Sequence, residues 1–141
     1  TTTAKVPHKW DFYHDMVGYN YRMPNLNAAL LVAQLENLDN FIHKKRKLAD
    51  MYEEFFKATD YYFVKELTGC KSNYWLNSII FKSKQHRNEF LNETNSQNVM
   101  TRPIWTLMSK LPMFEHAQCG DLKNSEWLEE RVVNIPSSVI L

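Results

Sequence analysis

The stretch from Gly18 to Glu36 constrains the fold of this 141-residue chain more than any other part of it. It starts as a polar and aromatic loop that contains Asn20 and Arg22, and it continues with an unbroken apolar run over residues 28–33. A helix that is hydrophobic on all sides is normally buried, so we expect this run to lie inside the protein. A carboxamide and a guanidinium at the mouth of such a helix would be placed to bind an anion.

Length, charge and cysteine content exclude several classes of protein. A chain of 141 residues can bury one core but is too short for two comfortable domains. The net charge of +1 gives no electrostatic footprint for nucleic acid, and no apolar run approaches the roughly 20 residues that span a membrane. The two cysteines and a start without the features of a signal peptide predict a reducing, cytoplasmic compartment.

Hydrophobic periodicity predicts an α/β architecture. The pattern predicts helices over residues 25–38, 39–57, 84–97 and 125–133, and strands over residues 61–66, 74–81 and 99–105. Pro24 and Asn25 suit the start of the first helix, and the basic run over residues 43–47 is interpreted as a solvated face of the second. We therefore expect two long helices and a small sheet of about three strands, covered by helices on one face, with Pro103 on an edge strand.

Several separate segments, spread over essentially the whole chain, carry a resemblance to a known family. These segments are Thr-Thr-Thr-Ala-Lys at residues 1–5, Gly-Tyr-Asn-Tyr-Arg-Met-Pro at 18–24, Ser-Asn-Tyr-Trp-Leu-Asn at 72–77, Met-Thr-Arg-Pro-Ile-Trp at 100–105 and Asn-Ile-Pro-Ser-Ser at 134–138. In this order they resemble the C-terminal region of the DegT/DnrJ/EryC1/StrS family of pyridoxal-phosphate-dependent sugar aminotransferases. Within it, the segments at 72–77, 100–105 and 134–138 look like the subgroup that makes legionaminic-acid-type sugars.

The resemblance implies a fold, a reaction and partners. It implies the small C-terminal domain of the aspartate-aminotransferase-like enzymes (fold type I), with residues 1–24 as an interdomain and active-site loop and residues 25–141 as the small domain. The chain would then be a fragment of a larger homodimeric enzyme, inactive alone, whose subunits meet through residues 18–36. That enzyme would use pyridoxal phosphate to aminate a nucleotide-linked 4-keto-6-deoxy sugar for surface-polysaccharide or nonulosonic acid biosynthesis, with glutamate as the amino donor.

The resemblance also suggests site residues. In the family, the asparagine that matches Asn20 reaches the cofactor phosphate of the neighbouring subunit, and the arginine that matches Arg22 lies at the same shared site. A carboxamide N–H and a planar guanidinium are both good donors to a phosphate. No lysine here matches the family's cofactor-binding lysine, so we expect no catalytic residue in this chain and place that lysine upstream.

A second group of residues is predicted to bind substrate. Arg102 precedes a proline at the end of a predicted strand, and Trp105 follows it closely, so the pair could hold an acid group and stack on a sugar or a base. Tyr74 and Trp75 are interpreted as core residues instead.

Two other interpretations remain open on the sequence alone. The chain could be a non-catalytic interaction or dimerisation module, or it could belong to a dehydratase relative of the family, in which a histidine replaces the lysine. A metal site built from Cys70, Cys119, His86 and His116 lacks any recognised ligand spacing, so no metal is expected.

Overall fold

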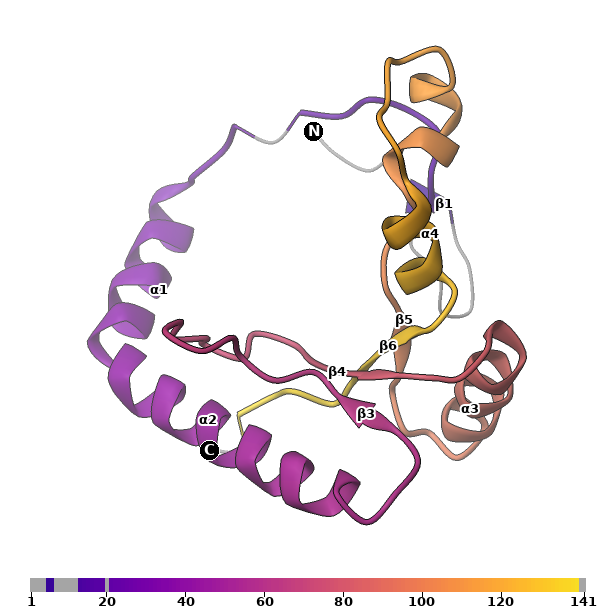
Figure 1. Cartoon of the computed structure of the whole chain (residues 1–141). Coiled ribbons are helices and arrows are strands. Elements are labelled where there is room, and N and C mark those ends of the chain that lie inside the picture. The colour runs from indigo at the N-terminus through magenta and orange to yellow at the C-terminus, as the bar shows by residue number, and fades with distance from the viewer. Residues whose placement is uncertain (1–4, 7–12, 20, 140–141) are drawn as a thin grey trace.

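The computed structural model describes residues 5–6, 13–19 and 21–139. Its helices are α1 (Asn25–Glu36), α2 (Leu38–Phe56), α3 (Lys84–Ser96) and α4 (Lys123–Glu129), with two 3₁₀ turns, η1 (Met108–Lys110) and η2 (Pro112–Phe114). Its strands are β1 (Lys5–Val6), β2 (Tyr13–His14), β3 (Tyr62–Phe63), β4 (Asn77–Ile80), β5 (Arg102–Pro103) and β6 (Val132–Ile135). Figure 1 shows how these elements are arranged.

The main sheet has four antiparallel strands in the order β3-β4-β6-β5, and β1 and β2 form a separate antiparallel pair. The prediction of about three strands was wrong because β6 was assigned to the end of the last helix. That helix, α4, ends at Glu129. The β-branched pair of Val132 and Val133 packs better in a pleated sheet than on a helix. The prediction that Pro103 lies on an edge strand is confirmed, since β5 pairs with β6 alone.

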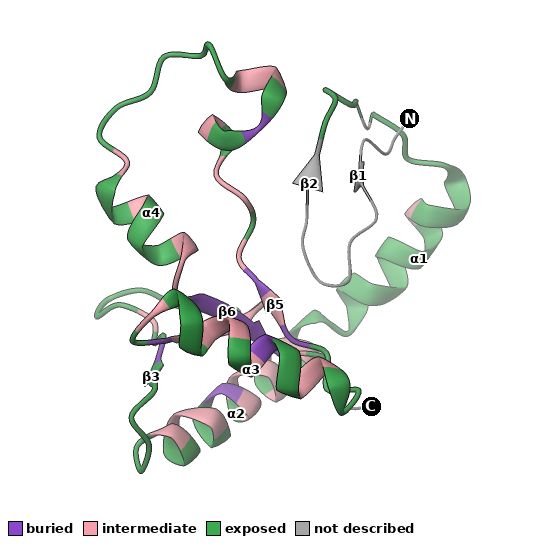
Figure 2. Ribbon diagram, turned by 90° about the vertical axis from the view of Figure 1, so that its right-hand side faces the viewer, coloured by how far each residue is buried: buried purple, intermediate pink, exposed green. Residues whose placement is uncertain are grey.

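The core lies between one face of the sheet and two helices. Ile79 of β4 and Val133 of β6 are paired in register and fully buried. They belong to one buried cluster with Ala49 of α2 and Leu91 of α3, so both helices cover the same face (Figure 2). Because successive strand residues alternate between faces, the polar residues next to them in sequence are turned toward the opposite face.

Helix α1 contradicts the expectation of burial. None of its residues is buried, and Leu26 and Leu30 keep 80% and 61% of their surface exposed. The physical reason is the position of α1. It precedes α2 in the chain and lies past the sheet, where it does not contact the core (Figures 1 and 2). Among the described residues, no helix has both the length and the apolar character needed to cross a membrane.

Candidate functional site

A groove at the end of the sheet brings together the two predicted substrate-binding residues. It has a volume of about 550 Å³. Its wall is formed by residues from α2, from the segment before β4, from β5 and from the end of β6. The lining residues that matter most are Lys45, Trp75, Arg102, Trp105, Asn134 and Ser137. We call this site the tryptophan groove.

Two indole rings form one wall of the tryptophan groove. The ring centroids of Trp75 and Trp105 lie 6.2 Å apart with an interplanar angle of 26°, which is a stacked arrangement. Trp75 is 65% exposed, so its interpretation as a core residue was wrong. It precedes β4 rather than lying within it. The polar residues at 71–73, just before Trp75, could have indicated that the buried strand begins after Trp75 rather than at residue 74.

Arg102 is held in place beside these rings. Its Nη1 donates to Asn95 Oδ1 at 2.9 Å and to the Thr101 carbonyl at 3.0 Å. Asn134 stands opposite Arg102 in the β5–β6 register, and its Oδ1 accepts a hydrogen bond from Ser78 Oγ at 2.7 Å. The groove therefore has a guanidinium with a fixed orientation and a carboxamide whose oxygen is already bonded.

Lys45 connects, by hydrogen bonds, the two loops that form the groove. Its Nζ donates to the carbonyl oxygens of Ser137, Trp75 and Tyr74 at 2.7, 3.2 and 3.5 Å. Burial lowers the pKa of this ammonium group. The interpretation of residues 43–47 as a solvated face is therefore wrong at Lys45, because this side chain bends back onto the protein.

The neighbouring Arg46 holds the same loop at its other end. Its guanidinium makes two parallel hydrogen bonds to the Glu66 carboxylate, at 2.6 and 3.0 Å, and a third to the Ser72 carbonyl at 2.6 Å. Glu66 also accepts the backbone N–H of Ser72 at 2.6 Å. Together, the Arg46 and Ser72 hydrogen bonds lower the pKa of the Glu66 carboxyl to about 2.

We expect Glu66→Gln to destabilise the chain in a pH-dependent way. The Glu66 pKa falls from an ordinary 4.5 to about 2 on folding, so the carboxylate stabilises the fold fully above pH 4.5. That contribution is lost as the pH falls toward 2. The melting temperature of the variant should therefore be lower than that of the parent at neutral pH, and the gap should close in acid.

The matched control is Glu54→Gln, which removes an exposed ion pair with Lys57. Exposed pairs contribute little to stability, so this variant should melt close to the parent throughout. A Glu66→Gln deficit that stays constant from neutral pH down to pH 2 would contradict the assigned role of the carboxylate.

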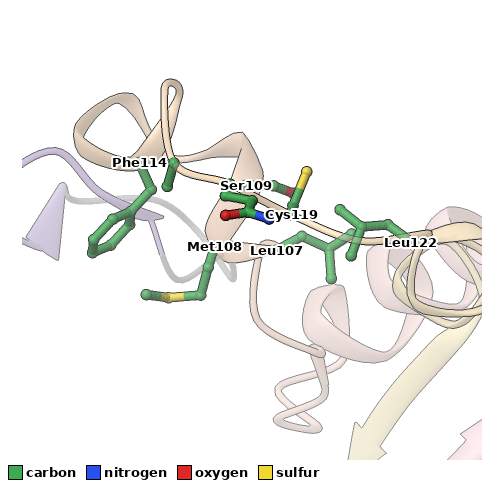
Figure 3. Close-up of a pocket in the computed structure, with 8 residues that line it drawn as sticks. Leu107, Met108, Ser109, Phe114, Cys119 and Leu122 are labelled. Carbon is green, nitrogen blue, oxygen red and sulfur yellow. The ribbon is translucent and has the colours of Figure 1, made fainter.

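A second cavity lies outside the sheet. It has a volume of about 330 Å³ and is lined by residues that include Leu107, Met108, Phe114, Cys119 and Leu122 (Figure 3). Its lining is mostly apolar, and Cys119 contributes its one thiol. Both cysteines are free and exposed. Among the residues that the structure describes, no three His, Cys, Asp or Glu side chains gather into a possible metal site.

Comparison with known proteins identifies the family. A model of the DegT/DnrJ/EryC1/StrS aminotransferase family matches residues 3–141. The chain belongs to this family. The GDP-perosamine synthase of Vibrio cholerae is 36% identical over 129 residues, which cover 89% of this chain and 35% of the relative. The GDP-4-keto-6-deoxy-D-mannose 3-dehydratase of Yersinia pseudotuberculosis is 27% identical over 131 residues, covering 88% and 33%.

Solved structures agree on the fold. Helicobacter pylori PseC, an aminotransferase involved in the biosynthesis of pseudoaminic acid, matches with a TM-score of 0.73 at 16% identity, and the match covers 94% of this chain and 37% of PseC. The Escherichia coli GDP-4-keto-6-deoxy-D-mannose-3-dehydratase with bound hydrated pyridoxal phosphate matches with a TM-score of 0.70 at 23% identity, covering 89% and 34%. The chain spans about a third of the length of the curated relatives that it matches.

These matches confirm the predicted family and, at the level of the fold, the α/β domain of fold type I. Pyridoxal phosphate is the cofactor of this family, as predicted. The legionaminic-acid-type subgroup stays a prediction.

The residues present fit a partial contact with this cofactor. Asn20 lies outside the described residues. Arg22 is exposed just before α1 and makes no hydrogen bond or ion pair with another described residue, so its guanidinium is available to an anion such as a phosphate. It does not line the tryptophan groove. Burial lowers the pKa of Lys45, but the Nζ atom of this lysine already donates to three carbonyl oxygens. The Arg22 guanidinium is thus free to donate to a phosphate, whereas the Lys45 ammonium is bonded to the backbone.

Proposed function

We propose that this chain is the C-terminal part of a pyridoxal-phosphate-dependent aminotransferase. The whole enzyme transfers an amino group from glutamate to a nucleotide-linked 4-keto-6-deoxy sugar, on a route to surface polysaccharide or nonulosonic acid. The observation that carries this proposal is the family match across residues 3–141, together with relatives named for GDP-perosamine synthesis. The chain alone is inactive, because the amine that binds the cofactor belongs to an upstream domain.

The proposal assigns a role to each part of the chain. Residues 1–24 form the interdomain and active-site segment, and residues 25–141 form the small domain. Asn20 and Arg22 hold the cofactor phosphate at a homodimer interface made by residues 18–36. The exposed apolar surface of α1 supports such an interface. The bound cofactor carries the amino group between donor and acceptor, while Arg102 and Trp105 hold and orient the substrate.

Isotope transfer tests the proposed reaction. The full-length protein is incubated with pyridoxal phosphate, nitrogen-15-labelled glutamate and a nucleotide-linked 4-keto-6-deoxy sugar, and the sugar is analysed by mass spectrometry. We expect the label to appear in the sugar. A sugar that stays unlabelled while the protein holds its cofactor would contradict the proposal.

Asn20→Ala and Arg22→Met should each weaken cofactor retention in the full-length protein. Each removes a hydrogen-bond donor to the phosphate, and hydrogen bonds to a charged group contribute about 1.5–3 kcal/mol, so the dissociation constant should rise by about tenfold or more. Dialysis followed by absorbance of the retained cofactor measures the effect. Lys47→Met, which removes an exposed cation from α2, is the control. If both site variants retain the cofactor as well as the parent does, the phosphate-binding role assigned to Asn20 and Arg22 is wrong.

A dehydratase is the second candidate. Two of the relatives are named GDP-4-keto-6-deoxy-D-mannose 3-dehydratase, at 27% and 30% identity. The same isotope experiment separates the two reactions, because the product of a dehydratase lacks a hydroxyl group of the substrate and gains no labelled nitrogen. A non-catalytic dimerisation module would change the sugar in neither way.

A further inference from the structure

We propose that the stacked pair of Trp75 and Trp105 is a platform for the base of the substrate's nucleotide. This inference deepens the proposed function and depends on it for the identity of the ligand. It assigns a role to Trp75, and it makes Lys45 a positioning residue for the platform.

Exposure is the first observation that supports a ligand here. Trp75, Trp105 and Met100 line one groove while keeping 65%, 45% and 68% of their surface exposed. Single exposed apolar residues are common, but a cluster of large ones around a hollow marks a binding site. The groove volume of about 550 Å³ lies within the range of about 300–1,000 Å³ that is typical of small-molecule sites.

The chemistry of the lining selects the class of ligand. Flat indole faces suit a planar base, and base–aromatic stacking is tolerant of the base identity. The lining contains the cations Arg102 and Lys45 and no carboxylate among the described residues. The Oδ1 atom of Asn134 already accepts a hydrogen bond from Ser78, so this side chain can offer a ligand its amide N–H groups as donors. An anion with a planar ring, such as a nucleoside diphosphate, complements this combination of aromatic faces, positive charge and donors.

The platform is also fixed before any ligand arrives. The backbone of Tyr74 has a φ of 45°, a value that bulky side chains rarely adopt. Lys45 holds the carbonyls of Tyr74 and Trp75, and the Arg46–Glu66 pair holds the loop just before them. Such restraints keep Trp75 against Trp105, which reduces the entropy that a ligand must overcome on binding.

The test measures nucleotide binding to this chain directly. Isothermal titration calorimetry is carried out with GDP, UDP and inorganic pyrophosphate on the parent, Trp75→Leu and Trp127→Phe. Trp127 is a suitable control because it is a half-exposed indole on α4, outside the groove. Far-ultraviolet circular dichroism follows the exciton couplet of the stacked indoles, which reports whether the platform is formed.

We expect Trp75→Leu to abolish the couplet and to weaken binding of GDP or UDP by at least fivefold, which is about 1 kcal/mol. Trp127→Phe should leave both unchanged, and pyrophosphate binding should not respond to Trp75→Leu. Lys45→Met should reduce the couplet and the nucleotide affinity, whereas Lys47→Met should change neither. A parent chain that shows the couplet but binds neither nucleotide overturns the inference. So does a parent without the couplet, or a Trp75→Leu variant whose nucleotide affinity stays within twofold.

This test is independent of the proposed reaction. Transfer of labelled nitrogen by the full-length protein, together with nucleotide binding that is insensitive to Trp75→Leu, would reject the platform alone. Binding that depends on Trp75 without nitrogen transfer would reject the aminotransferase reaction and keep the platform.

Discussion

Replacement of Leu91 by alanine is expected to lower the free energy of unfolding by about 3–5 kcal/mol. Leu91 is fully buried on α3, in the cluster that joins Ile79 and Val133 of the sheet to Ala49 of α2. Truncation removes apolar contacts and leaves a cavity that the sheet and two helices cannot collapse without moving. Urea titration of the parent and the variant, followed by linear extrapolation, measures the difference.

Leu26→Ala is the matched control, since Leu26 is the same residue type on a helix but is 80% exposed. Substitutions at such surface positions usually change stability by within about 0.5 kcal/mol. The two variants are compared at a protein concentration where the chain is monomeric. A loss of stability at Leu26 as large as that at Leu91 would contradict the exposed position of α1, because it would show that α1 is packed within the chain.

The second large effect concerns self-association through α1. Leu26 and Leu30 expose most of their surface, and burial of a leucine side chain contributes about 1.5–3 kcal/mol. If residues 18–36 form the homodimer interface, replacing both leucines by glutamate should raise the dimer dissociation constant by about a hundredfold or more. Sedimentation equilibrium of the parent and the double variant gives the two constants.

The control for association is Met51→Glu, which charges an exposed apolar residue on α2 rather than α1. It should leave the dissociation constant near that of the parent. A parent chain that is monomeric at all concentrations, or a dimer that is disrupted by Met51→Glu and not by the α1 variant, would contradict the proposed interface.

The sequence predicted the long helices well because their signals are local. α3 was predicted over residues 84–97 and spans Lys84–Ser96, and Ser83 caps it by accepting the His86 N–H at 3.3 Å. β6 had no such signal. All four of its residues are buried, so it lacks the alternation that marks a half-exposed strand, and it directly follows a helical pattern.

Part of the candidate site could also be predicted, because that part too has a local signal in the sequence. Arg102 and Trp105 are close in sequence, so their joint presence in the groove could be inferred from one segment. Trp75 joins them only through tertiary structure. It is placed by the positive φ of Tyr74 and by the Lys45 ammonium, which lies 30 residues away in sequence. No local pattern encodes that contact.

We propose that this chain supplies contacts to a cofactor whose reactive amine lies elsewhere in the protein. The most direct measurement is reduction with borohydride in the presence of pyridoxal phosphate, followed by peptide mass spectrometry of the full-length protein and of this chain. We predict one stoichiometric label on a lysine upstream of residue 1 in the full-length protein, and none in this chain. A stoichiometric label on a lysine within residues 1–141, such as Lys45, would contradict the account.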